Sequence, residues 1–233
     1  MPYVSFNTAL IVGAGSGLSA ALARVLAKEG IKVALAARST EDLASLSREV
    51  DAKTFACDAS KRADVEKLFA DLDSGFGAPE IVIYNASYRT RGAFIDLDPV
   101  DVEKALAVSA YGGFLVGQQA AKRMLIKKHG AIVFTGASAS VKGYAQSAPF
   151  AMGKFALRGL AQSMARELHP QGIHVAHVVI DGGIKSERRP EPAGQTASML
   201  NPASIAATYM HLIHQPHSAW SWEIEVRPWV EKF

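Results

Sequence analysis

Cysteine is almost absent from this sequence, since Cys57 is the single one among 233 residues. One thiol cannot form a disulfide within the chain, and this scarcity is typical of proteins that work in a reducing compartment. Long hydrophobic runs are lacking as well, because no uninterrupted apolar stretch reaches the roughly 18 residues of a membrane-spanning helix. The N-terminus also lacks the basic segment and apolar core of a signal peptide. We therefore expect a cytoplasmic protein without a membrane partner.

An excess of one charge is lacking too. The chain has 25 Lys and Arg residues against 22 Asp and Glu residues, and the two signs are interspersed. Proteins that bind nucleic acid carry a concentrated basic surface, so we expect no nucleic-acid partner. We also expect no metal site. What is present is a chain that is 49% apolar and 20% charged. This is enough to bury the core of a single domain spanning residues 1–233.

Apolar runs alternate with helical patterns along the chain. Short strands are expected at Ala9–Val12, Lys32–Ala37, Thr54–Cys57, Ile81–Asn85, Ala131–Gly136, His174–Ile180 and Glu223–Val226. Helices are expected to begin near Gly17, Ser39, Ser60, Pro99, Pro149 and Asn201, with Ser39 and Ser60 as N-caps and the fourth helix reaching Lys128. This alternation predicts an α/β fold, a doubly wound parallel sheet in one domain.

One segment breaks the alternation. Residues 181–201 are rich in Pro, Gly, Glu and Arg and show no clear periodicity. An irregular insertion of this length in a compact domain is more often a lid or a binding loop than a structural connection. We therefore expect a substrate loop there.

Three glycines follow the first expected strand on alternate positions, and a helical pattern follows them. Such a turn lets the backbone approach a pyrophosphate, whose charge then rests on the N–H groups of the helix N-terminus. The spacing departs from G-x-G-x-x-G because Leu18 stands at the third glycine, and it fits G-x-x-x-G-x-G with Ser19 in the last place. A purely structural tight turn is the alternative. The residues expected to hold a dinucleotide here are Gly13, Gly15, Ser16, Gly17 and Leu18.

The end of the second strand indicates which dinucleotide is bound. An acidic residue there accepts from the ribose 2′-hydroxyl of NAD, whereas an arginine accommodates the 2′-phosphate of NADP. This strand ends in Arg38 and Ser39 with no carboxylate, so we expect NADP(H), although a solvated arginine would look the same. After the third strand, Asp58 is placed to accept from the adenine amino group, or it closes an Asx turn at a helix entrance. Ala59 beside it is a further residue expected to bind the cofactor.

Four short motifs resemble those of the short-chain dehydrogenase/reductase family. They are Gly13-x-x-x-Gly17, Asn85-Ala86-Ser87 at a strand end, Lys154 on a helix, and Gly172-Ile-His-Val175 at a strand entrance. The resemblance covers nearly the whole chain. It implies a seven-stranded sheet of Rossmann type, a nicotinamide cofactor, a small-molecule substrate, and a homodimer or homotetramer built on two long helices.

The resemblance implies further cofactor contacts. It assigns Asn85-Ala86-Ser87 to the cofactor site, with Ser87 in place of the family's glycine. The segment Asp181-Gly182-Gly183-Ile184 resembles the family's Pro-Gly segment beside the nicotinamide, with Asp181 in place of proline. Gly182 and Ile184 are therefore expected to contact the cofactor.

The family's catalytic group of Asn, Ser, Tyr and Lys is only partly kept. Its Tyr-x-x-x-Lys motif places a phenol and an ammonium one helical turn apart, so that the lysine lowers the pKa of the tyrosine. Here the motif reads Phe150-Ala-Met-Gly-Lys154, and Phe150 cannot carry a proton. The serine position falls on Ala137 with Ser138 beside it, and the asparagine position falls on Ser109.

Alternative roles stay open for the residues at these positions. Lys154 is expected to hydrogen-bond the nicotinamide ribose, the alternative being a helix lysine in solvent. Ser138 can polarise a substrate carbonyl or simply cap a loop. Tyr144 is a candidate substitute acid, although an exposed or packing tyrosine would have the same spacing.

The expected substrate pocket is apolar. Phe94, Phe150, Met152 and the aromatic run Trp220–Trp229 supply bulk near the strand ends, unless that run belongs to the core or to a subunit interface. Such a pocket favours a small apolar carbonyl compound.

Two classes of function follow from these residues. The first is an NADP(H)-dependent oxidoreductase that acts on a carbonyl or alcohol without the usual tyrosine, because hydride transfer depends mainly on orientation and a polarised carbonyl. The second is a protein that binds NADP(H) without turnover, as a sensor, a scaffold or a partner subunit. A non-redox enzyme on the same fold is a third possibility.

Overall fold

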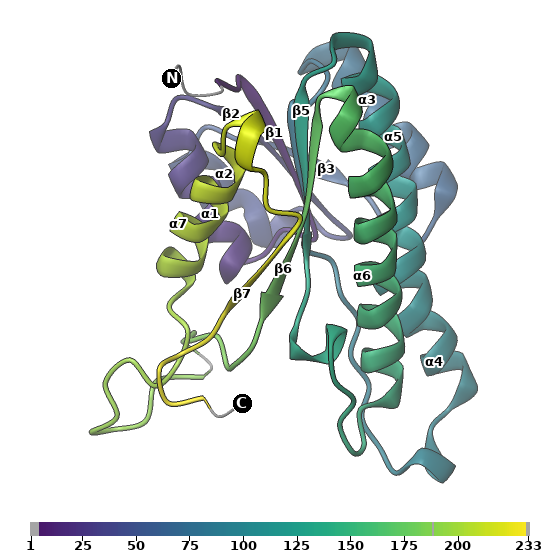
Figure 1. Cartoon of the computed structure of the whole chain (residues 1–233), viewed down its shortest axis with the longest axis vertical. Coiled ribbons are helices and arrows are strands. Elements are labelled where there is room, and N and C mark those ends of the chain that lie inside the picture. The colour runs from purple at the N-terminus through teal and green to yellow at the C-terminus, as the bar shows by residue number, and fades with distance from the viewer. Residues whose placement is uncertain (1–4, 188, 232–233) are drawn as a thin grey trace.

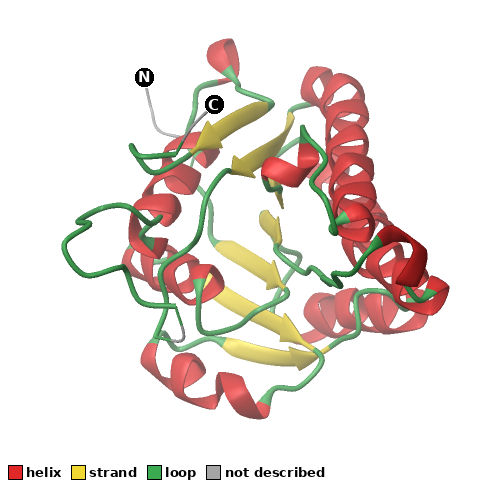
Figure 2. Ribbon diagram, turned by 90° about the horizontal axis from the view of Figure 1, so that it is seen from below, coloured by secondary structure: helices red, strands yellow, loops and turns green. Residues whose placement is uncertain are grey.

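The computed structural model describes residues 5–187 and 189–231. In this part of the chain the strands form one sheet with helices around it (Figure 2). The sheet has seven strands, all neighbours are parallel, and the order is β3-β2-β1-β4-β5-β6-β7. The strands are β1 Thr8–Val12, β2 Lys32–Ala37, β3 Lys53–Ala56, β4 Ile81–Tyr84, β5 Gly130–Thr135, β6 Ile173–Ile180 and β7 Glu223–Val226. The predicted doubly wound parallel sheet is confirmed.

The sheet separates two layers of helices (Figure 1). Apolar side chains of α1 Leu18–Lys28, α2 Ala44–Glu49 and α7 Pro202–Ile213 pack on one face of the sheet. Those of α3 Arg62–Gly75, α5 Gly112–Lys127 and α6 Ala148–Leu168 pack on the other, and α4 Pro99–Leu106 lies against α6. Because both faces are covered, the central strands β5 and β6 are buried at every residue.

Short 3-10 turns connect several of these elements. They are Glu41–Leu43, Phe94–Asp96, Ser138–Ser140, His169–Gln171 and His217–Ala219. Asp98 and Asn201 cap α4 and α7 by accepting backbone N–H groups of Val100 and Ala203, as expected at these Pro-containing helix starts.

The predicted N-caps Ser39 and Ser60 are wrong. The N-cap positions fall on Thr40 and Lys61, one residue further along, and neither side chain caps its helix. The Ser39 hydroxyl donates instead to Glu41 at 2.8 Å. The Ser60 hydroxyl donates to Asp58 at 2.6 Å, so a local side-chain bond competes with the cap.

The helix expected from Pro99 to Lys128 is interrupted by a π-helical turn, Ala107–Tyr111. The Tyr84 hydroxyl of β4 donates to the Val108 carbonyl, which keeps that oxygen out of a regular α-helical ladder. On the other side, Gly153 of α6 comes so close that a Cβ there would lie 2.8 Å from the Ser109 Cβ. A π-turn inside a helix frequently marks a functional site.

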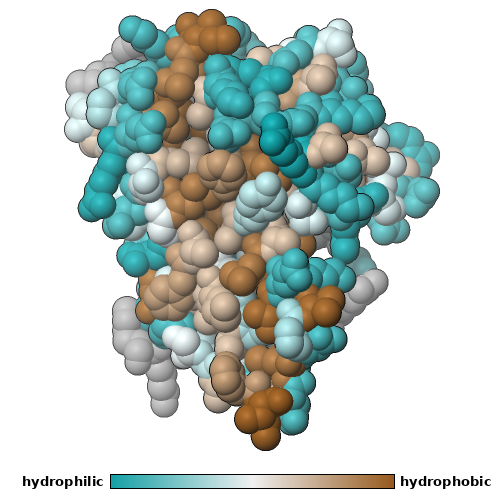
Figure 3. Space-filling model, turned by 90° about the vertical axis from the view of Figure 1, so that its right-hand side faces the viewer, coloured by the Kyte–Doolittle hydropathy of each residue, from teal (hydrophilic) through white to brown (hydrophobic). Residues whose placement is uncertain are grey.

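Large apolar side chains are exposed along α5 and α6. Tyr111, Phe114, Met152 and Phe155 are each between 42% and 48% exposed, and the Tyr111 and Phe114 rings stack at 6.3 Å between centroids. Figure 3 views this side of the molecule and shows apolar side chains running down it between hydrophilic flanks.

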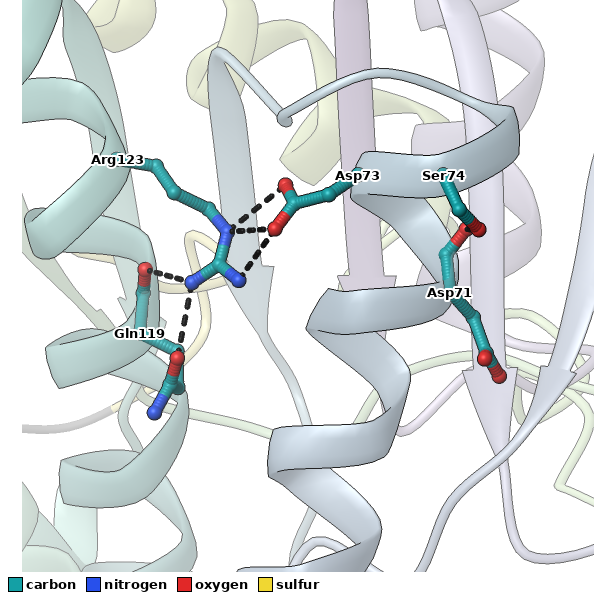
Figure 4. A network of polar contacts seen from close by, with 5 residues as sticks. All are labelled: Asp71, Asp73, Ser74, Gln119 and Arg123. Atoms are coloured by element: carbon teal, nitrogen blue, oxygen red, sulfur yellow. Dashed lines mark hydrogen bonds and ion pairs between the residues drawn. The ribbon is translucent and has the colours of Figure 1, made fainter.

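An ion pair between helices holds α3 and α5 together on this side of the sheet (Figure 4). The Arg123 guanidinium donates to both oxygens of Asp73, at 2.6–3.0 Å, and to the side chain of Gln119 at 2.8 Å. It also lies 4.9 Å from the centroid of the Phe69 ring. This network lies near the C-terminal ends of α3 and α5, and it stabilises the scaffold. In the described part of the chain, no helix combines the length and apolar character needed to cross a bilayer.

Candidate functional site

A cavity of about 1200 Å³ opens at the carboxyl ends of β1, β2 and β4. The strand order reverses between β1 and β4, and ligands of open α/β sheets bind at such a switch point. Most of the predicted cofactor residues line the cavity, namely Gly13, Gly15, Ser16, Gly17, Arg38, Ser39, Asp58, Ala59, Asn85, Ala86 and Ser87.

The glycines of the first turn serve two different purposes. Gly13 has φ +84°, and a Cβ there would lie 2.5 Å from the Ala86 Cα, so only glycine fits between β1 and β4. A Cβ on Gly15 or Gly17 would meet nothing within 4 Å, although both residues line the cavity. The space beside Gly15 and Gly17 is therefore free for a ligand.

Ser19 joins the glycine turn to the end of β4. Its buried hydroxyl donates to the Gly13 carbonyl at 3.0 Å and accepts from the Asn85 side-chain amide at 2.7 Å. Asn85 thus holds the turn with its side chain and is also one of the residues that line the cavity. Leu18 does not line it, because its side chain is buried in the core at the first position of α1. No side chain caps the N-terminus of α1 at Gly17, which leaves its first N–H groups available to an anion.

The charged residues at the ends of β2 and β3 face the same cavity. Arg38 follows β2, and Asp58 follows β3. Burial alone would raise the pKa of Asp58, but hydrogen bonds from Ser60 and the charges of Lys61 and Arg38 hold it below its usual value. The bonds from the Ser60 N–H and hydroxyl, at 3.1 Å and 2.6 Å, close the Asx-type turn that the sequence left open as an alternative.

Lys154 is buried on α6, one helical turn after Phe150. It is 3% exposed, so the alternative of a lysine in solvent is wrong. Its Nζ donates to the backbone carbonyl of Thr135 at 2.7 Å, and burial lowers the pKa of the ammonium to about 8. Neither Lys154 nor Phe150 lines the cavity of the glycine turn.

Two cations flank the Phe150 ring. The Arg89 guanidinium carbon lies 4.9 Å from the ring centroid, and the Lys154 Nζ lies 5.8 Å from it. Cations are attracted to the face of an aromatic ring within about 6 Å. Phe150, which stands where the family named above has its tyrosine, therefore lies in a positively charged environment.

The two predicted serines lie in different settings. Ser109 is fully buried in the π-turn, and its Oγ has no hydrogen-bond partner among the described residues. Ser138 begins a 3-10 turn after β5 and is partly exposed. The substitute acid considered above, Tyr144, is 45% exposed, with the Lys142 ammonium 5.9 Å from its ring centroid.

The segment 181–201 returns to its starting point and contacts the cavity. Ile184 and Leu200 form an isolated parallel bridge that closes the base of the loop. Gly182 packs against Pro228, since a Cβ there would lie 2.7 Å from the proline Cδ, and neither Gly182 nor Ile184 lines the cavity. Lys185, Ser186 and Glu187 line it instead. The loop thus reaches the cavity through residues just beyond the predicted ones.

Asp181, at the end of β6, is paired in the interior. It is 3% exposed, and its carboxylate contacts the Lys142 ammonium at 3.4 Å and the Arg227 guanidinium at 3.2 Å. The residue that replaces the family's proline therefore ties this strand end to the segments after β5 and β7.

Sequence reasoning missed several lining residues. They are Val12, Ala14, Ala37, Asp42, Leu43, Cys57, Tyr88, Val108, Lys185, Ser186, Glu187 and Pro202. Most of them are sequence neighbours of predicted positions at strand ends, and this adjacency could have identified them. Val108 is different, because it lies in the π-turn, far in the sequence from every predicted cofactor residue at a strand end.

The side chains predicted to form an apolar substrate pocket do not gather around one space in the structure. Phe94 is 80% exposed and Met152 is 48% exposed, so neither encloses a substrate in this structure. Trp220 stacks on His174 of β6, with 4.7 Å between ring centroids, and Trp229 is 79% exposed. Trp220 therefore packs on the protein itself, which was the alternative to a place in the substrate pocket. Among the described residues, no three His, Cys, Asp or Glu side chains are grouped to hold a metal ion.

The whole chain is similar to known proteins. The family model described as short chain dehydrogenase matches residues 7–193. A short-chain dehydrogenase structure from Rhodopseudomonas palustris is 33% identical, with a TM-score of 0.82 over 96% of this chain and 99% of that one. A metagenomic short-chain oxidoreductase, solved in complex with NADP, is 26% identical, with a TM-score of 0.84 over 97% and 98%. An uncharacterized oxidoreductase of Staphylococcus aureus (strain USA300) is 25% identical over 98% of this chain and 100% of its own.

Proposed function

Since the chain belongs to the short-chain dehydrogenase/reductase family, we propose that it binds NADP(H) and transfers a hydride to or from a small carbonyl or alcohol compound. The observation that carries this proposal is the cavity of about 1200 Å³ at the switch point of the sheet, with its glycine turn intact. Family membership supports the oxidoreductase class, and the remaining details rest on this chain's own residues.

The residues around the cavity fit the cofactor. Open space beside Gly15 and Gly17 suits a pyrophosphate, which the free N–H groups at the start of α1 would hold. Arg38 would take the 2′-phosphate, because its planar fork matches phosphate oxygens. The metagenomic relative was solved with NADP, which supports the same choice here.

Lys154 is the proposed carrier of the proton in the absence of a tyrosine. When bound, the nicotinamide supplies or accepts the hydride. A buried ammonium whose pKa is about 8 is protonated at neutral pH and can still release its proton, as a general acid must. Its bond to the Thr135 carbonyl fixes its position at the end of β5. Ser138, at the next turn, is the proposed donor to a substrate carbonyl.

The second candidate function is NADP(H) binding without turnover. The observation that favours it is Phe150, which stands where the family has its catalytic tyrosine. General acid catalysis contributes typically about 10²–10⁴-fold, so loss of the phenol alone slows the chemistry without abolishing it. We therefore favour a slow or unusual reductase over a silent one. The experiment is NADPH oxidation at 340 nm with a panel of ketones and aldehydes. Turnover with any of them supports the reductase, and tight cofactor binding without turnover supports the silent protein.

We also propose a homo-oligomer, a homodimer or homotetramer, formed through α5 and α6. The exposed side chains of Tyr111, Phe114, Met152 and Phe155 on these helices form an apolar surface that an isologous twofold contact would cover. Light scattering of the wild type and of Phe114→Glu tests this, because the charge would dissociate a dimer built there. A wild-type protein that stays monomeric at high concentration would contradict it.

The reducing cytoplasm is the proposed location. Cys57 is buried, and burial followed by the charges of Asp64 and Asp58 raises the pKa of its thiol to about 12. A thiol of this kind stays protonated and unreactive, which suits a protein that does not depend on disulfide chemistry.

A further inference from the structure

An aromatic residue, Tyr88, belongs to the wall of the cofactor cavity. It directly follows the segment Asn85-Ala86-Ser87 and is partly buried. Among the described residues that line the cavity it is the one aromatic residue, the others being small, aliphatic or polar. The planar base of a nucleotide stacks readily on the face of an aromatic ring. Tyr88 is therefore the residue of this wall that is suited to contact a base.

Two side chains of α4 hold the Tyr88 ring. The Tyr88 hydroxyl donates to the Asp101 carboxylate at 2.8 Å, and the Thr90 hydroxyl donates to the other oxygen of Asp101 at 3.4 Å. Lys104, three residues further on the same face of the helix, places its ammonium over the ring, 4.5 Å from the centroid. A cation at this distance is attracted to the face of the ring. One helix thus holds both the hydroxyl and one face of Tyr88.

These contacts leave the ring available to the cavity. Because Lys104 covers one face, Tyr88 meets the cavity through its other face and its edges. A side chain that is already held in place loses less rotamer freedom when a ligand binds, and this preorganisation increases affinity. Asp101 and Lys104 are therefore positioning residues for the ring.

Val108 continues this wall beyond Tyr88. It lies in the π-turn, about one helical turn after Lys104, and lines the same cavity. The start of α5, just after the π-turn, touches the segment that follows β3, because a Cβ on Gly112 would lie 2.7 Å from the Ala59 carbonyl oxygen. The side of the cavity that contains Tyr88 and Val108 therefore reaches the end of β3.

This side belongs to the adenosine half of the proposed cofactor site. Arg38 and Asp58, which follow β2 and β3, line the cavity, whereas Lys154 and Phe150 do not. In the proposed function Arg38 holds the 2′-phosphate of the adenosine ribose, and Lys154 acts at the nicotinamide. An aromatic ring on this wall therefore faces the adenine and not the nicotinamide.

We propose that Tyr88 stacks on the adenine of the bound dinucleotide, with Asp101 and Lys104 holding its ring in position. This inference rests on the proposed function and names a further binding residue for its cofactor. The ammonium of Lys104 also favours adenine over oxidised nicotinamide as the stacked ring. Adenine is neutral, whereas a cationic nicotinamide on the opposite face of the tyrosine would be repelled by the lysine.

Calorimetric titration of adenosine 2′,5′-bisphosphate tests the proposal, because this probe carries the adenine and the 2′-phosphate but no nicotinamide. Tyr88→Ala should weaken its binding about tenfold, as is typical for the loss of one base–aromatic stack. Tyr88→Phe, which keeps the ring, should stay within about threefold of wild type. The affinity for NADPH should fall by the same factors, because the adenine is common to both ligands. Tyr88→Leu, which keeps an apolar side chain without the ring, takes the place of Tyr88→Ala if the alanine variant does not fold.

Tyr144→Ala is the matched control. Tyr144 is an exposed tyrosine outside the lining of the cavity, and it too has a lysine ammonium near its ring, that of Lys142 at 5.9 Å from the centroid. This variant should bind both ligands as wild type does.

Equal affinity of wild type and Tyr88→Ala for adenosine 2′,5′-bisphosphate would overturn the proposal. A loss confined to NADPH would overturn it as well, because it would assign the ring to the nicotinamide. Failure of the proposed hydride transfer has a different signature, namely binding of the bisphosphate that depends on Tyr88 in a protein that never oxidises NADPH. If wild type binds neither ligand, both proposals fail.

Discussion

Gly13 and Ala86 lie so close together that a Cβ on Gly13 would sit 2.5 Å from the Ala86 Cα. The end of β1 and the end of β4 meet at this contact, which sets the floor of the cavity. Two residues further on, Gly15 has open space where a Cβ would be. Gly13 is thus required by the fold, whereas Gly15 leaves open the space that the proposed cofactor would use.

Alanine at Gly13 should therefore lower the stability of the protein, whereas alanine at Gly15 should weaken cofactor binding. Gly13→Ala should destabilise the protein by about 3 kcal/mol, because its φ is positive and its Cβ meets backbone. Gly15→Ala should unfold at the wild-type temperature and bind NADPH at least tenfold more weakly. Gly159→Ala, at an exposed and open position on α6, is the control: it should bind NADPH as wild type does and unfold at or slightly above the wild-type temperature, because alanine favours a helix over glycine. Unchanged NADPH binding in Gly15→Ala would mean that the turn is only structural.

Arg38→Ala should weaken NADPH binding about 10- to 100-fold and leave NADH binding nearly unchanged. The reason is that only NADPH carries the 2′-phosphate, and a hydrogen-bonded charge pair contributes about 1.5–3 kcal/mol. Fluorescence titrations of both cofactors measure the effect, with Arg166→Ala as the control. Equal losses for the two cofactors would remove the argument for NADP specificity.

Phe150→Tyr should speed the reduction of any accepted carbonyl compound by about 10²-fold or more. The new phenol would lie between the cations Arg89 and Lys154, which favour its deprotonated form and so lower its pKa. Initial rates across pH 6–10 measure the gain. Absence of any gain at every pH, in a variant that still binds NADPH, would show that the site has diverged beyond this one residue.

Lys154 should give the reductase reaction a characteristic pH dependence. Because burial lowers the pKa of its ammonium to about 8, the rate of reduction should fall as the pH rises through 8. Lys154→Met should lose this inflection along with most of the activity. A wild-type rate that stays constant from pH 7 to 9, with Lys154→Met inactive, would assign the residue a binding role alone.

The same lysine should also affect stability, with the sign fixed by linkage. The unfolded state holds its proton up to about pH 10.4, so between pH 8 and that value it binds more protons than the folded state. Stability should therefore rise with pH in this window, by up to about 3 kcal/mol. Denaturant titrations of wild type and Lys154→Met measure it, and the variant should lack the rise.

Acid should destabilise the protein through two buried histidines. Burial lowers the pKa of His174 and of His177 to about 4 each, although a hydrogen bond to Glu223 partly opposes this for His177. Since the unfolded state takes up these protons near pH 6.5, stability should fall steadily as the pH drops from 6.5 to 4. Denaturant titrations should show a shallower fall in His177→Asn and in His174→Asn. His211→Asn, exposed on α7, should keep the wild-type slope. Parallel slopes in all variants would contradict the assignment.

The features predicted well from the sequence are set by local chemistry. β2 and β7 have the predicted limits, because β2 is a short, largely apolar run and β7 alternates charged and apolar residues, and breaks in the pattern bound both. The glycine turn follows β1 directly, so the cavity beside it was predictable from a few adjacent residues.

The features missed depend on contacts between distant segments. The π-turn Ala107–Tyr111 depends on the Tyr84 hydroxyl and on close packing of Gly153, neither of which a helical pattern can reveal. Likewise, Arg89 and Phe150 are far apart in the sequence, and only the fold places the Arg89 guanidinium carbon 4.9 Å from the centroid of the Phe150 ring. The N-caps were displaced by one residue because Ser39 and Ser60 bond to nearby carboxylates instead.

The central claim is that the cavity between β1, β2 and β4 holds NADP(H). A fluorescence titration of the wild-type protein with NADPH and with NADH tests it most directly. We expect saturable binding of both cofactors, with NADPH bound at least tenfold more tightly than NADH. Failure of the protein to bind either cofactor at millimolar concentration would contradict it.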